Sequence, residues 1–302
     1  GSAFVDDTNM YVFGKWGETA SDIYSSAVEQ VTAWTKLLRV SGGSAKAVKS
    51  FWYLMDQVCV NGVWSWKNTE GCELEIEVDD GKREKIVSLP MNEEKKFLGV
   101  FDSPEGGNKK QLEKITNKFD TWIQRMRNGH LPPHLGWMSY RFKLWSSVRY
   151  GIGAMTNDLE EVEDFLSKRE RLILNILGVA STIKKGWRKL HSTFGGIGLY
   201  DFATEQLIER LNLMLQHYRS GSSLSKKMET SLAYLQLQLG TNKCPLDLDY
   251  EKWHFMVPLS WMKVLWKTLQ VTGFEVHLNY ETMELPRERD MIIMVWIMSA
   301  CD

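Results

Sequence analysis

FVDDTNMYVF, residues 4–13, sets two adjacent carboxylates, Asp6 and Asp7, between an apolar pair and a possible strand at residues 10–13. Thr8 and Asn9 are typical turn residues, so the stretch predicts a β-hairpin that carries the carboxylates at its turn. Vicinal carboxylates favour a hard cation such as Mg²⁺, which uses one or two protein carboxylates together with substrate phosphates. A solvated Asp-Asp pair in a surface turn is the alternative, and the dipeptide alone favours that alternative.

Four further segments follow in a fixed order. The first segment, at residues 34–43, contains WTKLL at 34–38 and SGG at 41–43, and the second, KSFWYL, occupies residues 49–54. KFLGV follows at 96–100, and GGIGL follows at 195–199. The first two segments predict a helix, a glycine turn and a lysine that enters a strand.

Together with FVDD, this ordered set resembles the palm motifs of reverse transcriptases, and GGIGL resembles a glycine-rich segment that follows the polymerase region in non-LTR retroelements. The resemblance covers residues 3–200. It implies that Asp6 and Asp7 hold Mg²⁺ or Mn²⁺, that Lys49 lies near the nucleotide site, and that Leu98 and Gly99 shape the primer grip.

The resemblance also implies the partners: an RNA template, a DNA primer duplex and, in the full-length enzyme, a dNTP. The family has a third catalytic aspartate on an earlier palm strand, and fingers that hold the nucleotide. Both precede the aromatic-x-Asp-Asp motif, which begins here at Phe4. We therefore expect an incomplete two-metal site, binding of the metal only with a complete palm, and no polymerase activity from this chain alone.

Composition places the chain among ordinary globular proteins. The 302 residues are 43% hydrophobic and 25% charged, with a net charge of −1, so nucleic acid would have to be bound by local basic patches. The four cysteines have no C-x-x-C spacing, which favours a reducing compartment, cytoplasmic or nuclear. The longest apolar run, residues 291–300, is too short to span a bilayer, so we expect no membrane association.

The sequence patterns predict an α+β fold that is predominantly helical. Residues 1–103 are expected to form a truncated antiparallel palm sheet, with a helix at 23–40 and a hairpin whose strands lie at 74–78 and 85–89. We expect a thumb-like helical region at 104–200, with an amphipathic helix at 159–177 whose apolar stripe includes Leu172, and a helical C-terminal extension at 201–302. In the extension, apolar residues at helical spacing predict a helix whose stripe includes Leu207 and Ile208, a second with its stripe at 224–239, and a short tryptophan-rich helix at 258–269.

A basic helix is expected at residues 109–127. Apolar residues at helical spacing line one face, and the other face carries few acids. The candidate nucleic-acid contacts on it are Lys109, Lys110, Lys114, Lys118 and Arg125. Lysines and arginines along a helix can meet successive phosphates. A solvated basic face is the equally weighted alternative, and the family position of the thumb favours nucleic acid.

A second basic patch lies at residues 184–191, KKGWRKLH, which contains no acid. Its candidate phosphate contacts are Lys184, Lys185, Arg188 and Lys189. The glycines at 195–198 lack the strand before and the helix after that a dinucleotide-binding fingerprint needs. We interpret them as a turn and close-packing element.

Two other functions stay open. The chain could be a non-catalytic module that grips duplex through the two basic patches, or a decayed element remnant that acts as a helical protein-interaction module. Apolar surface exposed by a missing palm and fingers would favour self-association.

Overall fold

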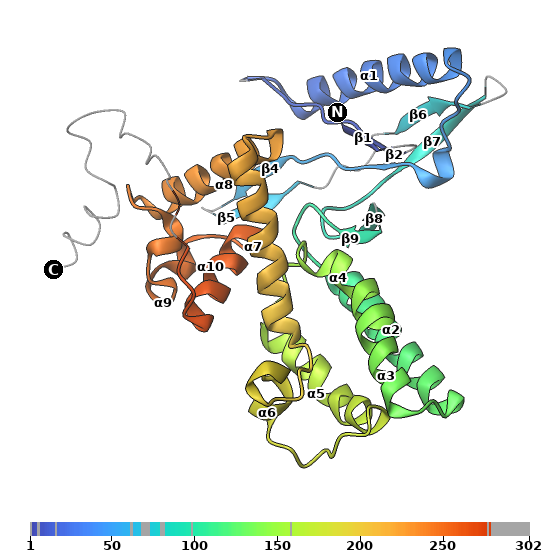
Figure 1. Ribbon diagram of the computed structural model, residues 1–302. Coiled ribbons are helices and arrows are strands. Elements are labelled where there is room, and N and C mark those ends of the chain that lie inside the picture. Colours follow the sequence, from blue (N-terminus) through green and yellow to red (C-terminus); the bar gives the residue numbers. More distant parts are fainter. Residues whose placement is uncertain are drawn as a thin grey trace. The chain divides into compact units, whose positions relative to one another are not determined.

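The computed structural model describes residues 2–4, 7–15, 17–60, 63–67, 73–78, 82–97, 99–157, 159–276 and 278. The chain forms two compact units, Gly1–Gly107 and Asn108–Asp302. The fold is mixed α+β and predominantly helical, as predicted (Figure 1). In the part of the chain that the structure describes, every helix is too short or too polar to cross a membrane.

The first unit is built around the helix α1, Ala20–Val40, which packs along the strand β6 (Figure 1). Thr19 and Asp22 form a capping box at its start, because each side chain bonds the backbone of the other residue. The helix ends at Val40 with Ser41 as its C-cap, and Gly42 follows with φ +83°, as expected of a glycine turn.

The strands of this unit are short. Three of them form a sheet in the order β3-β7-β6, and the other six form hairpins that pair β1 with β2, β4 with β5, and β8 with β9. The bounds are β1 Ser2–Phe4, β2 Asp7–Asn9, β3 Phe51–Trp52, β4 Gln57–Val60, β5 Val63–Trp66, β6 Leu74–Glu77, β7 Arg83–Ser88, β8 Lys95–Phe97 and β9 Val100–Asp102. A short 3₁₀ helix, η1 at Ala47–Lys49, precedes β3.

Two expectations for this unit need correction. The predicted hairpin at 74–89 is confirmed, with Leu74 and Ile76 buried, but β3 pairs with β7 in parallel, so the three-stranded sheet is mixed rather than antiparallel. The expected strand at residues 10–13 is wrong: strand pairing joins Ser2–Phe4 to Asp7–Asn9. Thr8 and Asn9 therefore extend a strand instead of forming the turn.

The first half of the second unit is a helical bundle with a continuous aromatic core. Its helices are α2 Lys109–Gly129, α3 Pro133–Ser139, the π-helix η2 Tyr140–Trp145, α4 Ser146–Ile152, α5 Leu159–Ile176, α6 Lys185–Lys189 and the 3₁₀ helix η3 Ser192–Phe194. Phe119 packs edge-to-face against Trp145 and Phe165, with ring centroids 6.0 and 5.5 Å apart. The apolar stripe expected on α5 is largely present, but Leu172 faces outward and Leu174 is buried instead.

The second half of this unit forms another apolar cluster. Its helices are α7 Phe202–Ser220, α8 Ser223–Leu239, the 3₁₀ helix η4 Pro245–Asp247, α9 Tyr250–Trp253, the 3₁₀ helix η5 His254–Met256 and α10 Trp261–Thr272. The predicted stripe of α8 is buried from Met228 to Leu239. On α7, Ile208 was expected in the stripe and is 43% exposed. The tryptophan-rich helix begins at Trp261, capped by Ser260, rather than at Pro258.

The two halves meet at the C-terminal end of α4. The backbone carbonyl of Ile152 accepts a hydrogen bond from Gln206, that of Gly153 accepts one from the Trp261 indole at 2.7 Å, and that of Met155 accepts one from Arg210. Helix ends leave their last carbonyls without partners inside the helix. Side chains from α7 and α10 satisfy these carbonyls, so residues on both sides of position 200 share buried hydrogen bonds.

Candidate nucleic-acid interface

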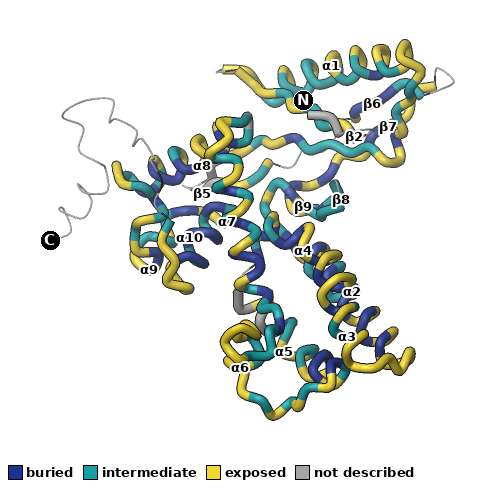
Figure 2. The backbone as a smooth tube through the Cα atoms, in the orientation of Figure 1, coloured by how far each residue is buried: buried dark blue, intermediate teal, exposed yellow. Residues whose placement is uncertain are grey.

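The helix α2 is amphipathic along its whole length, as its sequence predicts. Its apolar residues recur at helical spacing and pack into the aromatic core of the second unit. Figure 2 shows this buried side along one edge of the helix and exposed positions along the rest. The buried apolar residues are Ile115, Phe119, Trp122, Ile123 and Met126, and Leu112 is half-buried.

Four of the five predicted basic residues of α2 align on one side. With 3.6 residues per turn, Lys110, Lys114, Lys118 and Arg125 fall within a sector of roughly 80°. We call these four residues the basic stripe. At 1.5 Å of rise per residue, the stripe extends over about 22 Å. Lys109, the fifth residue, is exposed on a different side of the helix.

The acidic residue nearest the middle of α2 points away from the stripe. Both carboxylate oxygens of Asp120 accept hydrogen bonds from Arg169 on α5, at 2.7 and 2.8 Å. This bidentate pair satisfies Asp120 and ties α2 to α5. The Asp120 carboxylate is therefore engaged by α5.

Lys118 contributes to the packing of the helical bundle. Its ammonium donates a hydrogen bond to the backbone carbonyl of Ser147 on α4, and burial lowers its pKa. Lys118 therefore joins two helices of the bundle. Lys110 and Arg125 are exposed, and Lys114 is half-buried. A variant of these three residues leaves the hydrogen bond between Lys118 and Ser147 in place.

Two residues of the second basic patch, Arg188 and Lys189, anchor the segment. Arg188 donates to the carbonyls of Ile183 and Ser181, at 2.6 and 2.8 Å, and lies 3.4 Å from Glu170. Lys189 forms an ion pair with Asp201. Lys184 and Lys185 are exposed. Two of the four predicted phosphate contacts thus fix the segment to α5 and to the start of α7.

The glycine-rich stretch folds back onto this patch, as the turn and close-packing interpretation predicts. Backbone amides of Ile197 and Leu199 donate to the carbonyls of Trp187 and Arg188, at 3.0 and 2.8 Å. A Cβ atom at Gly196 would lie 2.0 Å from the Leu190 carbonyl oxygen, a distance that only glycine permits. Residues 184–198 therefore form one closely packed element, which we call the 184–198 segment.

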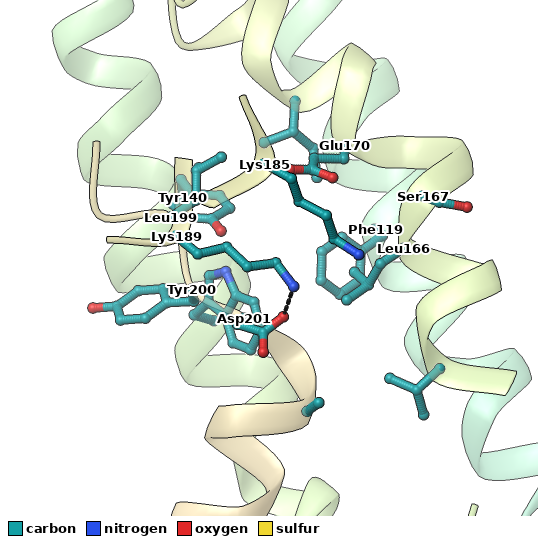
Figure 3. Close-up of a pocket in the computed structure, with 14 residues that line it drawn as sticks. Phe119, Tyr140, Leu166, Ser167, Glu170, Lys185, Lys189, Leu199, Tyr200 and Asp201 are labelled. Carbon is teal, nitrogen blue, oxygen red and sulfur yellow. Dashed lines mark hydrogen bonds and ion pairs between the residues drawn. The ribbon is translucent and has the colours of Figure 1, made fainter. Parts of the chain in front are cut away.

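A small pocket lies between α5 and this segment. Figure 3 shows the side chains of Lys185 and Lys189 reaching into it, with Lys189 bonded to Asp201. Its volume is about 50 Å³, whereas pockets for drug-sized ligands usually measure several hundred. The pocket has room for a few water molecules and none for a nucleotide.

Two pKa shifts at this pocket describe its electrostatics. Burial raises the pKa of the Tyr140 hydroxyl, which keeps it protonated. Burial also raises the pKa of Asp201, but hydrogen bonds from Lys189 and Thr204 outweigh this effect, and the pKa of the carboxyl is lowered overall. Asp201 also caps α7, where an anion is favoured by the helix dipole. The polar groups of the pocket are thus explained by packing.

The residues predicted for catalysis are only partly described. Asp6 and the side chain of Asp7 lie outside the described residues, as does Leu98, while the backbone of Asp7 belongs to β2. Lys49 is exposed at the end of η1. Gly99, with φ +86°, lies between Phe97 and Val100, which pair across the β8–β9 hairpin. Their roles in catalysis and in a primer grip stay predictions.

Metal ligands do not gather elsewhere in the described structure. Among the described residues, no group of three or more His, Cys, Asp or Glu side chains could hold a metal ion. Asp6 and the Asp7 carboxylate were outside this search, so Mg²⁺ and Mn²⁺ stay predictions.

Sequence reasoning missed the buried arginine of α7. Arg210 is fully buried, donates to the carbonyl of Met155, and lies 3.3 Å from the Thr268 hydroxyl. Burial lowers its pKa to about 10. The only sequence signal is that Arg210 falls within one turn of Leu207 and Leu211, on the apolar side of the helix.

Neither protein-family models, nor characterised protein sequences, nor solved structures match this chain.

Proposed function

We propose that this chain is part of a retroelement reverse transcriptase, an RNA-directed DNA polymerase, and that α2 holds the template–primer duplex. The observation that carries the proposal is the basic stripe. It places three to four cations along one side of a single helix over about 22 Å, which matches roughly six or seven nucleotides of one strand.

The order of elements along the chain adds support. The β8–β9 hairpin, with Gly99 in its turn, directly precedes α2, and the FVDD stretch comes earlier. In reverse transcriptases the helical thumb likewise follows the primer grip, so the order of elements here resembles that family. A helix fixed in a packed core is also a suitable platform, because its cations meet phosphates without first ordering the backbone.

Salt-dependent binding tests the proposal. A 14-base-pair RNA·DNA hybrid with a fluorescent end is titrated with the chain at several salt concentrations, and affinity is measured by anisotropy. The variant Lys110→Gln/Lys114→Gln/Arg125→Gln is expected to weaken binding and to lower the slope of log K against log salt by roughly 2 to 3, because about 0.9 counterions are released per phosphate neutralised.

The matched control is Arg219→Gln/Lys226→Gln/Lys243→Gln, which removes the same charge from exposed positions of α7, α8 and the loop after α8. It is expected to leave the slope unchanged. Equal effects of the two triple variants would indicate that binding depends on the overall charge of the chain rather than on a site on α2. Unchanged binding of the first variant would contradict the proposal.

Asp6 and Asp7 belong to the proposal as ligands of Mg²⁺ or Mn²⁺, with Lys49 near the nucleotide and Leu98-Gly99 at the primer end. Because metal binding is expected only with a complete palm, the chain alone is expected to leave the free-ion signal of Mn²⁺ in electron paramagnetic resonance nearly unchanged. Loss of that signal that Asp6→Asn/Asp7→Asn restores would mean that this hairpin binds the metal without the rest of the palm, and loss that persists in the variant would remove these residues from the metal site.

A further inference from the structure

We propose that the 184–198 segment is a binding site for single-stranded nucleic acid, in which bases stack on Trp187 and Phe194. This inference goes beyond the proposed function, because it concerns an unpaired strand and a surface other than α2. It does not depend on polymerase chemistry.

The first observation is the exposure of two aromatic rings in one short element. Trp187 is 53% exposed and Phe194 is 73% exposed. Of the tryptophans whose burial the structure describes, Trp187 is the only exposed one, whereas Trp145 and Trp266 in the same unit are almost completely buried. Large aromatic rings are normally used to fill cores, so a pair left in solvent within eight residues indicates a surface for contact.

The second observation is that the backbone beneath these rings is fixed. The carbonyl of Trp187 accepts a hydrogen bond from Ile197, and a Cβ atom at Gly195 would lie 4.0 Å from the Trp187 ring. Phe194 is the last residue of the 3₁₀ helix η3, and its amide donates a hydrogen bond to the His191 carbonyl at 3.0 Å. Because the platform is formed in advance, a base can stack on it without the cost of ordering a loop.

The third observation is the charge around the rings. No acidic residue lies between Glu170 and Asp201 in the sequence, and the carboxylates of both pair with Arg188 and Lys189. Lys184 is exposed and lies three residues before Trp187. The segment therefore keeps a positive charge next to its rings.

Arg141 extends this charge beyond the segment. Its guanidinium would lie 3.8 Å from a Cβ atom at Gly198 and lies 5.3 Å from the Trp137 ring. Cations that flank exposed aromatic rings are the pattern by which proteins hold an unpaired strand: phosphates meet the cations and bases stack on the rings. A duplex keeps its base faces stacked inside, so it cannot use the rings.

To test the proposal, fluorescent 12-mers of ribouridine and of deoxythymidine are titrated with the chain, and affinity is measured by anisotropy. Comparison of the two 12-mers shows whether the site prefers an RNA or a DNA strand. Stacking contributes about 1–3 kcal/mol per base, so Trp187→Ala/Phe194→Ala is expected to weaken binding by about tenfold or more. Trp187→Phe keeps a stacking ring and is expected to retain most of the affinity. Phe255→Ala, which removes an equally exposed ring on η5, is the matched control and is expected to have no effect.

A spectroscopic measurement accompanies the titration. Stacking of a base on Trp187 is expected to quench part of the tryptophan emission of the wild-type chain, and Trp187→Phe is expected to abolish that part. Circular dichroism verifies that each variant is folded. Affinity that is unchanged in the double variant, or quenching that persists in Trp187→Phe, would overturn the proposal, as would the absence of binding to both 12-mers.

The two proposals can be tested independently of each other. The stripe variant Lys110→Gln/Lys114→Gln/Arg125→Gln is expected to lose affinity for the hybrid duplex and to keep its affinity for the 12-mers. The Trp187→Ala/Phe194→Ala variant is expected to do the reverse. Parallel loss of both affinities in either variant would contradict two distinct sites.

Discussion

Among the residues that the structure describes, the two units of the chain form apolar clusters of very different size. The apolar cluster of the first unit contains Ala47, Leu74, Ile76 and Ile86 among the described residues, while the clusters of the second unit contain eighteen and twelve buried residues. In α1 of the first unit, Leu37 and Val40 are largely exposed. We infer that the second unit holds most of the stability, and both proposed binding surfaces lie on it.

The largest expected effect is the loss of a core ring. Phe119→Ala in the second unit removes a fully buried side chain that contacts two other rings, so we expect the free energy of unfolding to fall by about 3–5 kcal/mol. Phe13→Ala in the first unit removes a ring that is 83% exposed and should change the free energy by less than about 0.5 kcal/mol. Urea denaturation measures both, and equal losses would break the comparison between the units.

A smaller effect is expected at the glycine-rich turn of the second unit. Gly196→Ala would place a methyl group against the Leu190 carbonyl, which should cost about 1–3 kcal/mol. Gly186→Ala adds the same methyl group to α6 where no atom lies within 4 Å, so it should be neutral or slightly stabilising. Thermal unfolding of the two variants measures the difference, and similar melting temperatures would show that close packing does not explain the glycine.

The smallest effect concerns ion pairs and their pH dependence. The pKa of Asp201 is lowered in the folded state, so its contribution to stability is present above its ordinary pKa and is lost as the pH falls below about 4. Asp201→Asn should therefore reduce the free energy of unfolding by about 1 kcal/mol at pH 7 and by much less at pH 3. Urea denaturation at the two pH values measures this.

The first unit supplies the matched control for this prediction. Its Asp56–Lys67 pair is 3.3 Å apart, and the lysine is mostly exposed. Asp56→Asn should leave stability unchanged within error at both pH values, because exposed ion pairs contribute little. A loss as large as that of Asp201→Asn would mean that exposure does not separate the two pairs.

Sequence patterns predicted the long amphipathic elements well. The helix at α2, the stripe of α8 and the β6–β7 hairpin followed from periodicity, because each has one side against a core. The strand expected at residues 10–13 failed for a related reason. A short apolar run such as residues 10–13 forms a strand only where a neighbouring strand pairs with it, and here the pairing involves residues 7–9.

The candidate surfaces were predictable only in part. Helical geometry alone aligns Lys110, Lys114 and Arg125, but nothing in the sequence shows that Lys118 bonds the Ser147 carbonyl. In the same way, the sequence KKGWRKLH alone indicates a single basic patch. The sequence does not show that Arg188 pairs with Glu170 and Lys189 with Asp201, or that these long-range contacts anchor the segment.

The capped end of α4 bears on how the chain can be divided. The carbonyls of Ile152, Gly153 and Met155 accept hydrogen bonds from side chains that follow residue 200, and that of Ile152 also accepts one from the Met155 amide. A protein shortened at that position would lose all three side-chain donors, and Arg210 in the removed piece would lose the Met155 acceptor. We therefore expect a recombination breakpoint between residues 153 and 268 to destabilise the protein. Recombination that keeps the protein folded should transfer this stretch as a single block.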